Sequence, residues 1–316
     1  MRVLSRVGVL IAPETSPGVY VQPTQTVKVE SVITPNIEFD TVELPNFSFF
    51  GGTADVATIA DWGRASIEIQ TSLYRSLSFY ETLFAISNLK KTALLDNDPA
   101  NPNPNDADSL SDGWKFVPWT HSSATASLDL VLPDRRFKIK GAKSSFKMSG
   151  KVGDRVQVIF NVQGSYEDRE IAPQTLADTA GDEIMFNRRL GGMTLNGVSI
   201  NMSEFEFDMN STLAYEKFTN VGEFHLSDYA PKLTLKMRLE DGGADGFEEF
   251  KSGATMDFVA DFRDASGKVI WRLFIPKAKL STQPSFEDSE GIFVITREFK
   301  ALSSAGDDNF ALYYFI

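Results

Sequence analysis

The chain has 316 residues, of which 42% are hydrophobic and 25 are phenylalanine, enough apolar material to bury two cores. It has no cysteine, which excludes disulfide frameworks, thiolate-ligated metal centres and thiol catalysis. The 31 basic and 43 acidic residues leave a net charge of −12, which disfavours tight binding to the phosphate backbone of a nucleic acid.

The N-terminal segment combines a short apolar run with several breaks. Pro13, Pro17 and Pro23 interrupt it, and Glu14 adds a charge before the run reaches the length of a secretory signal. We therefore expect residues 1–35 to form an extended N-terminal arm. No apolar run in the chain approaches the roughly 20 residues that a membrane-spanning helix requires, so we expect no membrane insertion.

Strand patterns follow this segment, and one short helical pattern interrupts them. Apolar residues alternate in IEFDTVEL and NFSFF, and SIEIQTSLY at Ser66–Tyr74 predicts the first long strand. The sequence FYETLFAISNL then places its apolar residues on one helical face. Ser78 is placed as an N-cap, Glu81 completes a capping box, and the helix should end near Asn88.

A polar segment rich in Asn, Pro and Asp, at 96–113, has no hydrophobic period and predicts an exposed loop inserted at about residues 92–122. Loops of this length are usually functional or disordered, and we expect this one to contact a neighbouring subunit. Strands in ASLDLV, FKIKGAK and RVQVIFNVQGSY then predict an antiparallel meander with one polar face. Residues 171–190 lose this pattern and are interpreted as a linker.

The second half of the sequence repeats the order of patterns in the first. ASLDLV at Ala126–Val131 returns as ATMDFV at Ala254–Val259, and SIEIQTSLY returns as KLTLKMRLE. Three shorter matches keep the same order: NFSFF with EFEFD, YETL with FEEF, and IKGAK with IPKAK. An internal duplication accounts for this order better than the alternation that any two β-rich segments share. We therefore predict two tandem domains, residues 36–170 and 191–316.

Signals for catalysis are weak. His121 and His225 lie far apart in the sequence, without the spacing of a metal site. The glycines of RRLGGMTLNG lack the Gly-Lys-Ser/Thr of a phosphate-binding loop. Two carboxylates of glycosidase type could still converge among the 43 acidic residues, although no pair stands out. We therefore expect neither an enzyme nor a cofactor.

Several of these segments resemble the tail tube proteins of tailed bacteriophages. In the first copy the resemblance lies in SIEIQTSLY, FYETLFAISNL and the hairpin FKIKGAKSSFKMSGKVGDRVQVIFNVQGSYED. In the second it lies in NMSEFEFDMNSTL, KLTLKMRLE, FEEF and the hairpin from Ala254 to Leu280. It implies a mainly β fold with two tandem tail-tube-like sandwich or barrel domains, each flanked by one short α-helix.

The resemblance also implies a function without chemistry. Such proteins form rings whose sheets join edge to edge, and the rings stack into the conduit through which phage DNA passes without specific binding. A chain with two domains would need three copies per ring, giving a homotrimer with pseudo-six-fold symmetry. The implied partners are other copies of the chain and the tail terminator, tape measure and baseplate or tip proteins. The implied location is the virion tail, assembled in the host cytoplasm.

Two groups of residues are candidate functional sites under this hypothesis. Acidic residues that alternate with apolar ones would form either an ordinary solvated face or a negatively charged lumen wall: Glu204, Glu206, Asp208, Asp257 and Asp261. Polar and aromatic residues of the arm and the loop would contact the next ring: Tyr20, Val21, Asp96, Asn103, Asp106 and Asp112.

Two other classes of function remain open from the sequence. A β-barrel porin fits the length, acidity, alternation and aromatic tail ALYYFI, but such a barrel needs no helix. A carbohydrate-binding or carbohydrate-hydrolysing β-sandwich would use exposed aromatic residues, with Trp114, Trp119, Tyr74 and Tyr80 as candidates. Aromatic residues in an antiparallel sheet, however, usually serve packing.

Overall fold

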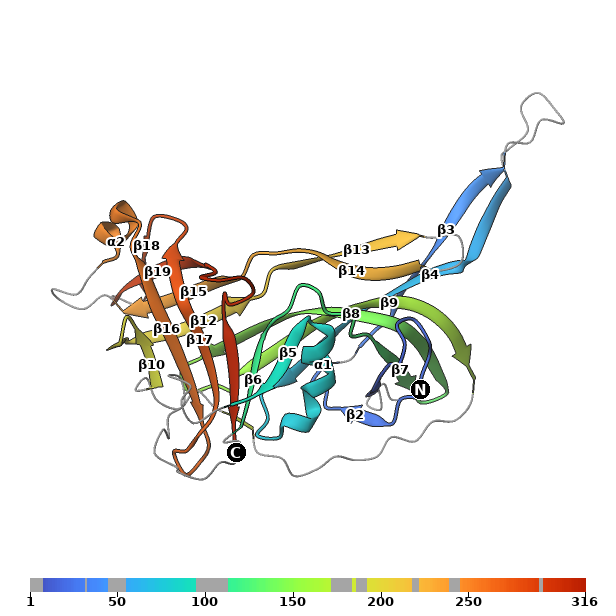
Figure 1. Cartoon of the computed structure of the whole chain (residues 1–316), viewed down its shortest axis with the longest axis horizontal. Helices are drawn as coiled ribbons and strands as arrows, with labels where there is room; N and C mark the ends of the chain where they lie inside the picture. Colours follow the sequence, from blue (N-terminus) through green and yellow to red (C-terminus); the bar gives the residue numbers. More distant parts are fainter. Residues whose placement is uncertain are drawn as a thin grey trace.

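A computed structural model describes residues 8–31, 33–44, 55–94, 113–171, 184–185, 192–217, 222–238, 245–289 and 292–316. Antiparallel strands dominate these residues, and two short α-helices accompany them (Figure 1). The expected mainly β fold is confirmed. We call residues 8–171 the first half and residues 192–316 the second half.

The elements of the first half are β1 (Gly8–Pro13), β2 (Gln25–Val27), β3 (Asn36–Leu44), β4 (Asp55–Ser72), the 3-10 turn η1 (Leu77–Phe79), α1 (Glu81–Ile86), β5 (Leu89–Ala93), β6 (Gly113–Pro118), β7 (Ala126–Leu132), β8 (Arg135–Lys151) and β9 (Gln157–Glu170). Those of the second half are β10 (Met193–Leu195), β11 (Val198–Ser199), β12 (Met202–Asp208), β13 (Ser211–Lys217), β14 (Gly222–Tyr229), β15 (Lys232–Arg238), α2 (Phe247–Ser252), β16 (Thr255–Arg263), β17 (Val269–Leu280), β18 (Ser285–Ser289), β19 (Ile292–Ala301) and β20 (Ala311–Phe315).

The two halves pair their strands in the same order. In the first half the order is β1-β7-β8-β9-β4-β3, and every neighbouring pair is antiparallel. In the second half it is β10-β16-β17-β19-β15-β12, again antiparallel throughout. Each series also begins with a short hairpin, β1 with β2 and β10 with β11. The division into two domains stays a prediction, and this shared order is what a duplicated module requires.

The halves are joined edge to edge at two places. The C-terminal part of β8 pairs with β12, from Lys147 opposite Asp208 to Lys151 opposite Glu204. The C-terminal strand β20 lies between β17 of its own half and β6 of the other. The Trp271 indole N–H, fully buried in β17, donates to the Tyr74 carbonyl oxygen at 2.9 Å. Both joints therefore tie strands that are far apart in the sequence.

A continuous apolar core runs through both halves. The Phe84 ring of α1 lies 5.6 Å from the rings of both Phe146 and Phe160, measured between centroids. Phe146 in turn contacts Phe207 of β12 at 5.9 Å and Phe310 at 6.0 Å. Because all five rings are fully buried, the two halves share their packing as well as their strand edges.

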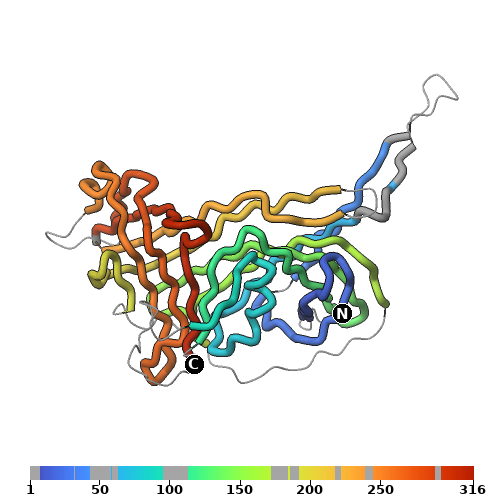
Figure 2. Tube along the Cα trace, viewed as in Figure 1, coloured from blue at the N-terminus to red at the C-terminus, as the bar shows by residue number. Residues whose placement is uncertain are grey.

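Two hairpins extend from the sheets. The hairpin of β13 and β14 runs from the second half across the first and packs against β8 and β9. The hairpin of β3 and β4 projects from the far end of the first half, away from the body of the molecule (Figures 1 and 2). The β13–β14 hairpin therefore lies on a surface of this chain, whereas the described parts of β3 and β4 extend beyond the body.

The N-terminal segment and the ends of the inserted loop differ from expectation. From Gly8 to Pro13 the expected arm is a strand of the sheet, since β1 pairs with β7 and β2. Strands β5 and β6 pair with each other at the two ends of the expected loop, so the described parts of 92–122 are largely strand. Most of the expected linker, residues 172–183 and 186–190, lies outside the described residues.

The start of α1 also differs from expectation. Ser78 lies inside the 3-10 turn, and the residue that caps α1 is Tyr80, with no side-chain capping bond. Tyr80 is 1% exposed, and its hydroxyl accepts from the Tyr74 backbone N–H and donates to the Ser72 carbonyl oxygen. We infer that this buried anchor, rather than a capping box, sets the beginning of the helix.

Candidate assembly interface

The acidic residues of β12 share one face of the strand. Glu204, Glu206 and Asp208 alternate with phenylalanines that are fully buried on the other face. The Glu206 carboxylate lies 2.8 Å from the Lys147 ammonium, and that of Glu204 lies 3.8 Å from Lys151. Both lysines come from β8, so these ion pairs cross the joint between the halves. Such half-exposed pairs are worth about 0.2–1 kcal/mol each.

The same polar face continues over β15, with more lysines. The Lys232 ammonium lies 2.9 Å from a Glu298 carboxylate oxygen of β19. The Lys236 ammonium lies 2.7 Å from Glu287, whose hydrogen bond and charge raise the pKa of Lys236. The acids of β12 therefore belong to a surface of paired charges rather than to a wall of one sign.

The other two acidic candidates lie apart from this face. Asp257 and Asp261 belong to β16, which pairs with β10 and β17 in the described part of the chain. The Asp261 carboxylate accepts from the Arg272 guanidinium at 2.6 Å and from Arg263 at 3.1 Å. Its side chain is 8% exposed, so its charge is largely compensated within the chain. The structure thus brings three of the five predicted acids together and separates the other two.

The predicted contact residues of the N-terminal segment are engaged within the chain. The Tyr20 hydroxyl donates to Asp129 at 2.8 Å, and the Val21 backbone N–H donates to the Ser127 hydroxyl at 2.9 Å. Burial and the Asp129 carboxylate raise the pKa of Tyr20 far above its usual value. Asp129 is fully buried beside Arg136, and burial raises its pKa. These bonds fix Tyr20 and Val21 against β7.

The other predicted contact residues, Asp96, Asn103, Asp106 and Asp112, lie outside the described residues. The strands that flank them form a hairpin, and its last described bond runs from the Leu94 backbone N–H to the Gly113 carbonyl oxygen at 3.1 Å. β6 also pairs with β20. The strand ends that flank the polar segment therefore lie at the second joint between the halves.

Sequence reasoning missed the contact made by the β13–β14 hairpin. The Arg64 guanidinium lies over the Tyr215 ring at 5.6 Å, and Lys217 forms an ion pair with Asp40. The Ser165 hydroxyl donates to the Gly222 carbonyl oxygen at 2.9 Å. These contacts hold the hairpin of the second half against β4 and β9 of the first. Alternation in STLAYEK predicts a strand, but nothing in it indicates where the hairpin lies.

Exposed apolar side chains lie on β18 and β19 of the second half and on the β3–β4 hairpin of the first. Phe286 of β18 is 45% exposed and stacks on Phe247 of α2, with ring centroids 5.8 Å apart. Phe293 of β19 is 66% exposed, and Phe39 of the β3–β4 hairpin is 39% exposed. In the described part of the chain, β18 pairs with β19 alone. An unpaired strand edge with apolar side chains beside it invites another strand.

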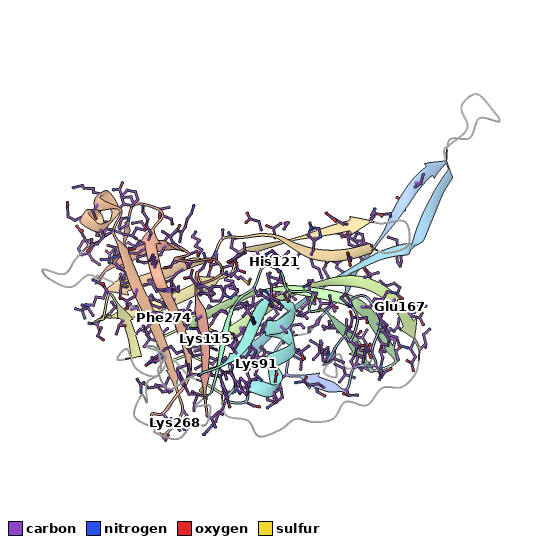
Figure 3. All side chains as sticks on the ribbon, viewed as in Figure 1. Lys91, Lys115, His121, Glu167, Lys268 and Phe274 are labelled. Carbon is purple, nitrogen blue, oxygen red and sulfur yellow. The ribbon has the colours of Figure 1, made fainter. Side chains whose placement is uncertain are left out.

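The aromatic residues proposed for sugar binding do not form one exposed surface. Tyr80 and Tyr74 are buried in the core. Trp114 is half-buried with the Lys91 ammonium 3.9 Å from its ring centroid, and the neighbouring Lys115 lies 5.3 Å from the Tyr313 ring (Figure 3). Trp119 is 40% exposed but stands apart from the two buried tyrosines. These four residues therefore do not form a shared stacking platform for a sugar ring.

Two sequence comparisons, with family models and with curated proteins, find no match. In the ranges that the structure describes, no three or more of His, Asp and Glu come together as a metal site would require. No helix among them has the length and apolarity to cross a membrane.

Proposed function

We propose that this chain is the structural protein of a bacteriophage tail tube, which polymerises into stacked rings that conduct DNA during ejection. The observation that carries this proposal is the joint at β8 and β12. There, two halves with the same order of strand pairing meet edge to edge within one chain. A head-to-tail contact of this kind, repeated by further copies, generates a closed ring when the rotation closes.

The number of chains in the ring follows from the repeat. If each half supplies one of six equivalent positions, three chains complete a ring with pseudo-six-fold symmetry. Closing the sheet also removes the hazard of an open strand edge, because its N–H and C=O groups then have partners. In this proposal the stability of the ring comes from edge pairing and apolar contacts rather than from a cofactor.

The polar face of β12 and β15 is the proposed lining of the conduit. Its carboxylates at Glu204, Glu206 and Asp208 lie beside lysines, so few charges of either sign are left uncompensated. Duplex DNA carries about one charge per 1.7 Å of its axis, and an unpaired row of lysines would retain it. A face of paired charges lets the duplex pass. We place Asp257 and Asp261, on β16, outside this lining.

The remaining parts of the proposal concern location and partners. We propose that the rings assemble in the host cytoplasm and belong to the virion tail. The ends of the stack would meet a tail terminator and baseplate or tip proteins, with a tape measure protein inside during assembly. The polar segment that leaves between β5 and β6 is the candidate contact between successive rings.

Electron microscopy of the purified full-length chain tests the proposal. We expect hollow rods or rings, with three chains per ring when native mass measurement is applied to the smallest closed species. Six chains per ring would overturn the trimer. A chain that stays monomeric at millimolar concentration, with no rods at any salt concentration, would overturn the tube.

A further inference from the structure

We infer that the edge of β18 that faces away from β19, on which the structure describes no paired strand, is the docking site for residues 33–36 of a second copy, in the register that β12 adopts on β8 within one chain. The β3–β4 hairpin of that second copy would then lie over the neighbouring strands of the second half. This inference deepens the proposed function, because it names the surfaces that meet. The contact itself does not require a closed ring, because the same contact, repeated by further copies, would also build an open row of subunits.

The first step establishes which residues of β9 and β19 are equivalent. Ser66 begins SIEIQTSLY and lies opposite Gln163 in the pair of β4 and β9. Lys232 begins KLTLKMRLE, its repeat, and lies opposite Lys300 in the pair of β15 and β19. Gln163 therefore corresponds to Lys300, and the two strands can be followed residue by residue from there.

The second step identifies β18 with the end of β8. Four residues before Gln163, Ile159 lies opposite Lys147 of β8. Four residues before Lys300, Thr296 lies opposite Ser285 of β18. Ser285–Ser289 therefore corresponds to residues 147–151, the five residues that β12 covers in the first half. The edge that β12 covers at β8 carries no second strand at β18 in the part of the chain that the structure describes.

The third step identifies the segment that would occupy the open edge. Asp208 at the end of β12 lies opposite Lys232, and Asn36 at the start of β3 lies opposite Ser66. Because Lys232 and Ser66 are equivalent, Asn36 corresponds to Asp208. The residues leading into β3 are then the counterpart of β12. Ile33 among them is 3% exposed, as expected for the position of the fully buried Phe205.

Burial at equivalent positions shows what the open edge lacks. Met148 of β8 is fully buried with Phe207 of β12 directly opposite, whereas its counterpart Phe286 is 45% exposed. Directly before β9, Val156 is fully buried, and its counterpart Phe293 in β19 is 66% exposed. The second half therefore exposes apolar side chains where the first half has them covered. A second copy seated as β12 is seated would cover Phe286.

The register of the contact between copies follows from these equivalences. Glu206 lies opposite Ser149 within the chain, which places Thr34 of one copy opposite Glu287 of the next. Pro35 takes the place of Phe207. Backbone hydrogen bonds at each end of the intrachain joint, at Met209 and Ser203, place Phe207 at a hydrogen-bonding position. Proline has no N–H, so the contact between copies has one fewer bond and is weaker than the joint within a chain.

The hairpins extend the same contact. The β13–β14 hairpin follows β12 and packs against β8 and β9 of the first half. The β3–β4 hairpin follows residues 33–36 and projects beyond the body, with Phe39 and Val42 being 39% and 45% exposed (Figure 1). On a neighbouring copy seated at β18, this hairpin lies on the side of β17 and β19, the counterparts of β8 and β9. Edge and hairpin therefore face the same neighbour.

Cysteine pairing in this cysteine-free chain tests the register. Thr34→Cys and Glu287→Cys are made as two separate single variants of the full-length chain, mixed and oxidised. We expect a disulfide-linked dimer that contains one chain of each variant, because opposed residues of an antiparallel pair lie within disulfide reach. Glu206→Cys with Ser149→Cys in one chain is the positive control, since oxidation should form a disulfide within that chain and link no second chain to it.

Two further variants test whether the cross-link depends on the predicted register or only on the closeness of the two copies. Thr34→Cys mixed with Asp288→Cys should cross-link far less, because adjacent residues of a strand point to opposite faces. Phe286→Asp should weaken association ~tenfold or more, because it puts a charge where an apolar contact forms. Val198→Asp is its matched control, at an apolar residue that is 67% exposed away from the edge.

The outcomes distinguish this inference from the proposed function. Rods that form without the Thr34–Glu287 cross-link would overturn the edge assignment and leave the tube standing. A specific cross-link between copies that build no rings or rods would support the edge and overturn the tube. Equal cross-linking at Glu287 and Asp288 would also overturn the register. A chain that remains monomeric at every concentration would overturn both.

Discussion

The two halves share their order of strand pairing but differ in how each packs its helix. In the first half Leu83, Phe84 and Ile86 of α1 are buried, and the Phe84 ring lies among other aromatic rings. In the second half α2 has no buried residue, and its Phe250 is 38% exposed. The sheet order therefore does not depend on how deeply the helix is packed.

One substitution in the core accounts for much of this difference. Phe160 of β9 contacts Phe84, and its counterpart in β19 is Arg297. Arg297 is 5% exposed, and burial lowers its pKa while Asp245 and Glu249 favour its charged form. A cavity of about 400 Å³ lies beside it, between α2 and the sheet. A buried guanidinium needs polar neighbours, so α2 cannot close down on an apolar core as α1 does.

The largest expected effect is the difference in stability between a variant in α1 and a variant in α2. Phe84→Ala removes a fully buried ring with five aromatic neighbours and should lower the free energy of unfolding by about 3–5 kcal/mol. Phe250→Ala, at the helix that stays on the surface, should cost roughly 1 kcal/mol or less. Urea unfolding of both variants measures the difference. Equal losses would mean that α2 packs as tightly as α1.

A second difference concerns one equivalent pair of lysines. Lys143 in IKGAK is 4% exposed, with its ammonium 3.0 Å from the Asn88 side-chain oxygen and 2.9 Å from the Ser122 carbonyl oxygen. Burial lowers the pKa of Lys143 to about 8. Its counterpart Lys279 in IPKAK is exposed.

The lowered pKa makes folding depend on pH. The folded state binds this proton less tightly than the unfolded state, so stability rises as pH increases from about 8 towards the ordinary value of 10.5. The slope is at most about 1.4 kcal/mol per pH unit. Lys143→Met should abolish this rise between pH 8 and 9.5, as measured by urea unfolding, whereas Lys279→Met should leave it unchanged. A rise that persists in Lys143→Met would assign it to another group.

The smallest effect is expected on the polar face of the joint. Glu206→Gln removes the partner of Lys147 and should lower stability by roughly 0.5 kcal/mol, a loss that disappears in 1 M salt. Phe207→Ala, on the buried face of the same strand, should cost several-fold more. Thermal unfolding at low and high salt compares them. A large, salt-independent loss for Glu206→Gln would mean that the ion pair holds the halves together.

Local patterns predicted much of the secondary structure. Alternation located β7, β12, β15 and β16, and the apolar spacing in FYETLFAISNL located α1. Three of the repeat pairs fall on strands that pair in the same order: SIEIQTSLY with KLTLKMRLE, ASLDLV with ATMDFV, and IKGAK with IPKAK. The pair YETL and FEEF falls at the two helices, and NFSFF lies outside the described residues. What could not be predicted is long-range. β1 finds its partner β7 more than 100 residues later, and its few residues up to Pro13 gave no signal of that partner.

The candidate site was predictable only within single strands. A period of two residues places Glu204, Glu206 and Asp208 on one face, as observed. Their lysine partners come from β8, and neither segment has a sequence pattern that predicts which strand will pair with it. The position of Asp257 and Asp261 depends likewise on β16 pairing with β10 and β17.

The shared rings of Phe146, Phe207 and Phe310 have a consequence for turnover of an assembly. These rings come from both halves and are buried against one another, so neither half can leave without exposing the packing of the other. In the proposed ring, growth and loss would then proceed two positions at a time. A missing copy would leave a gap of one third of the circumference, too wide for neighbouring edges to bridge, and incomplete circles would be eliminated early.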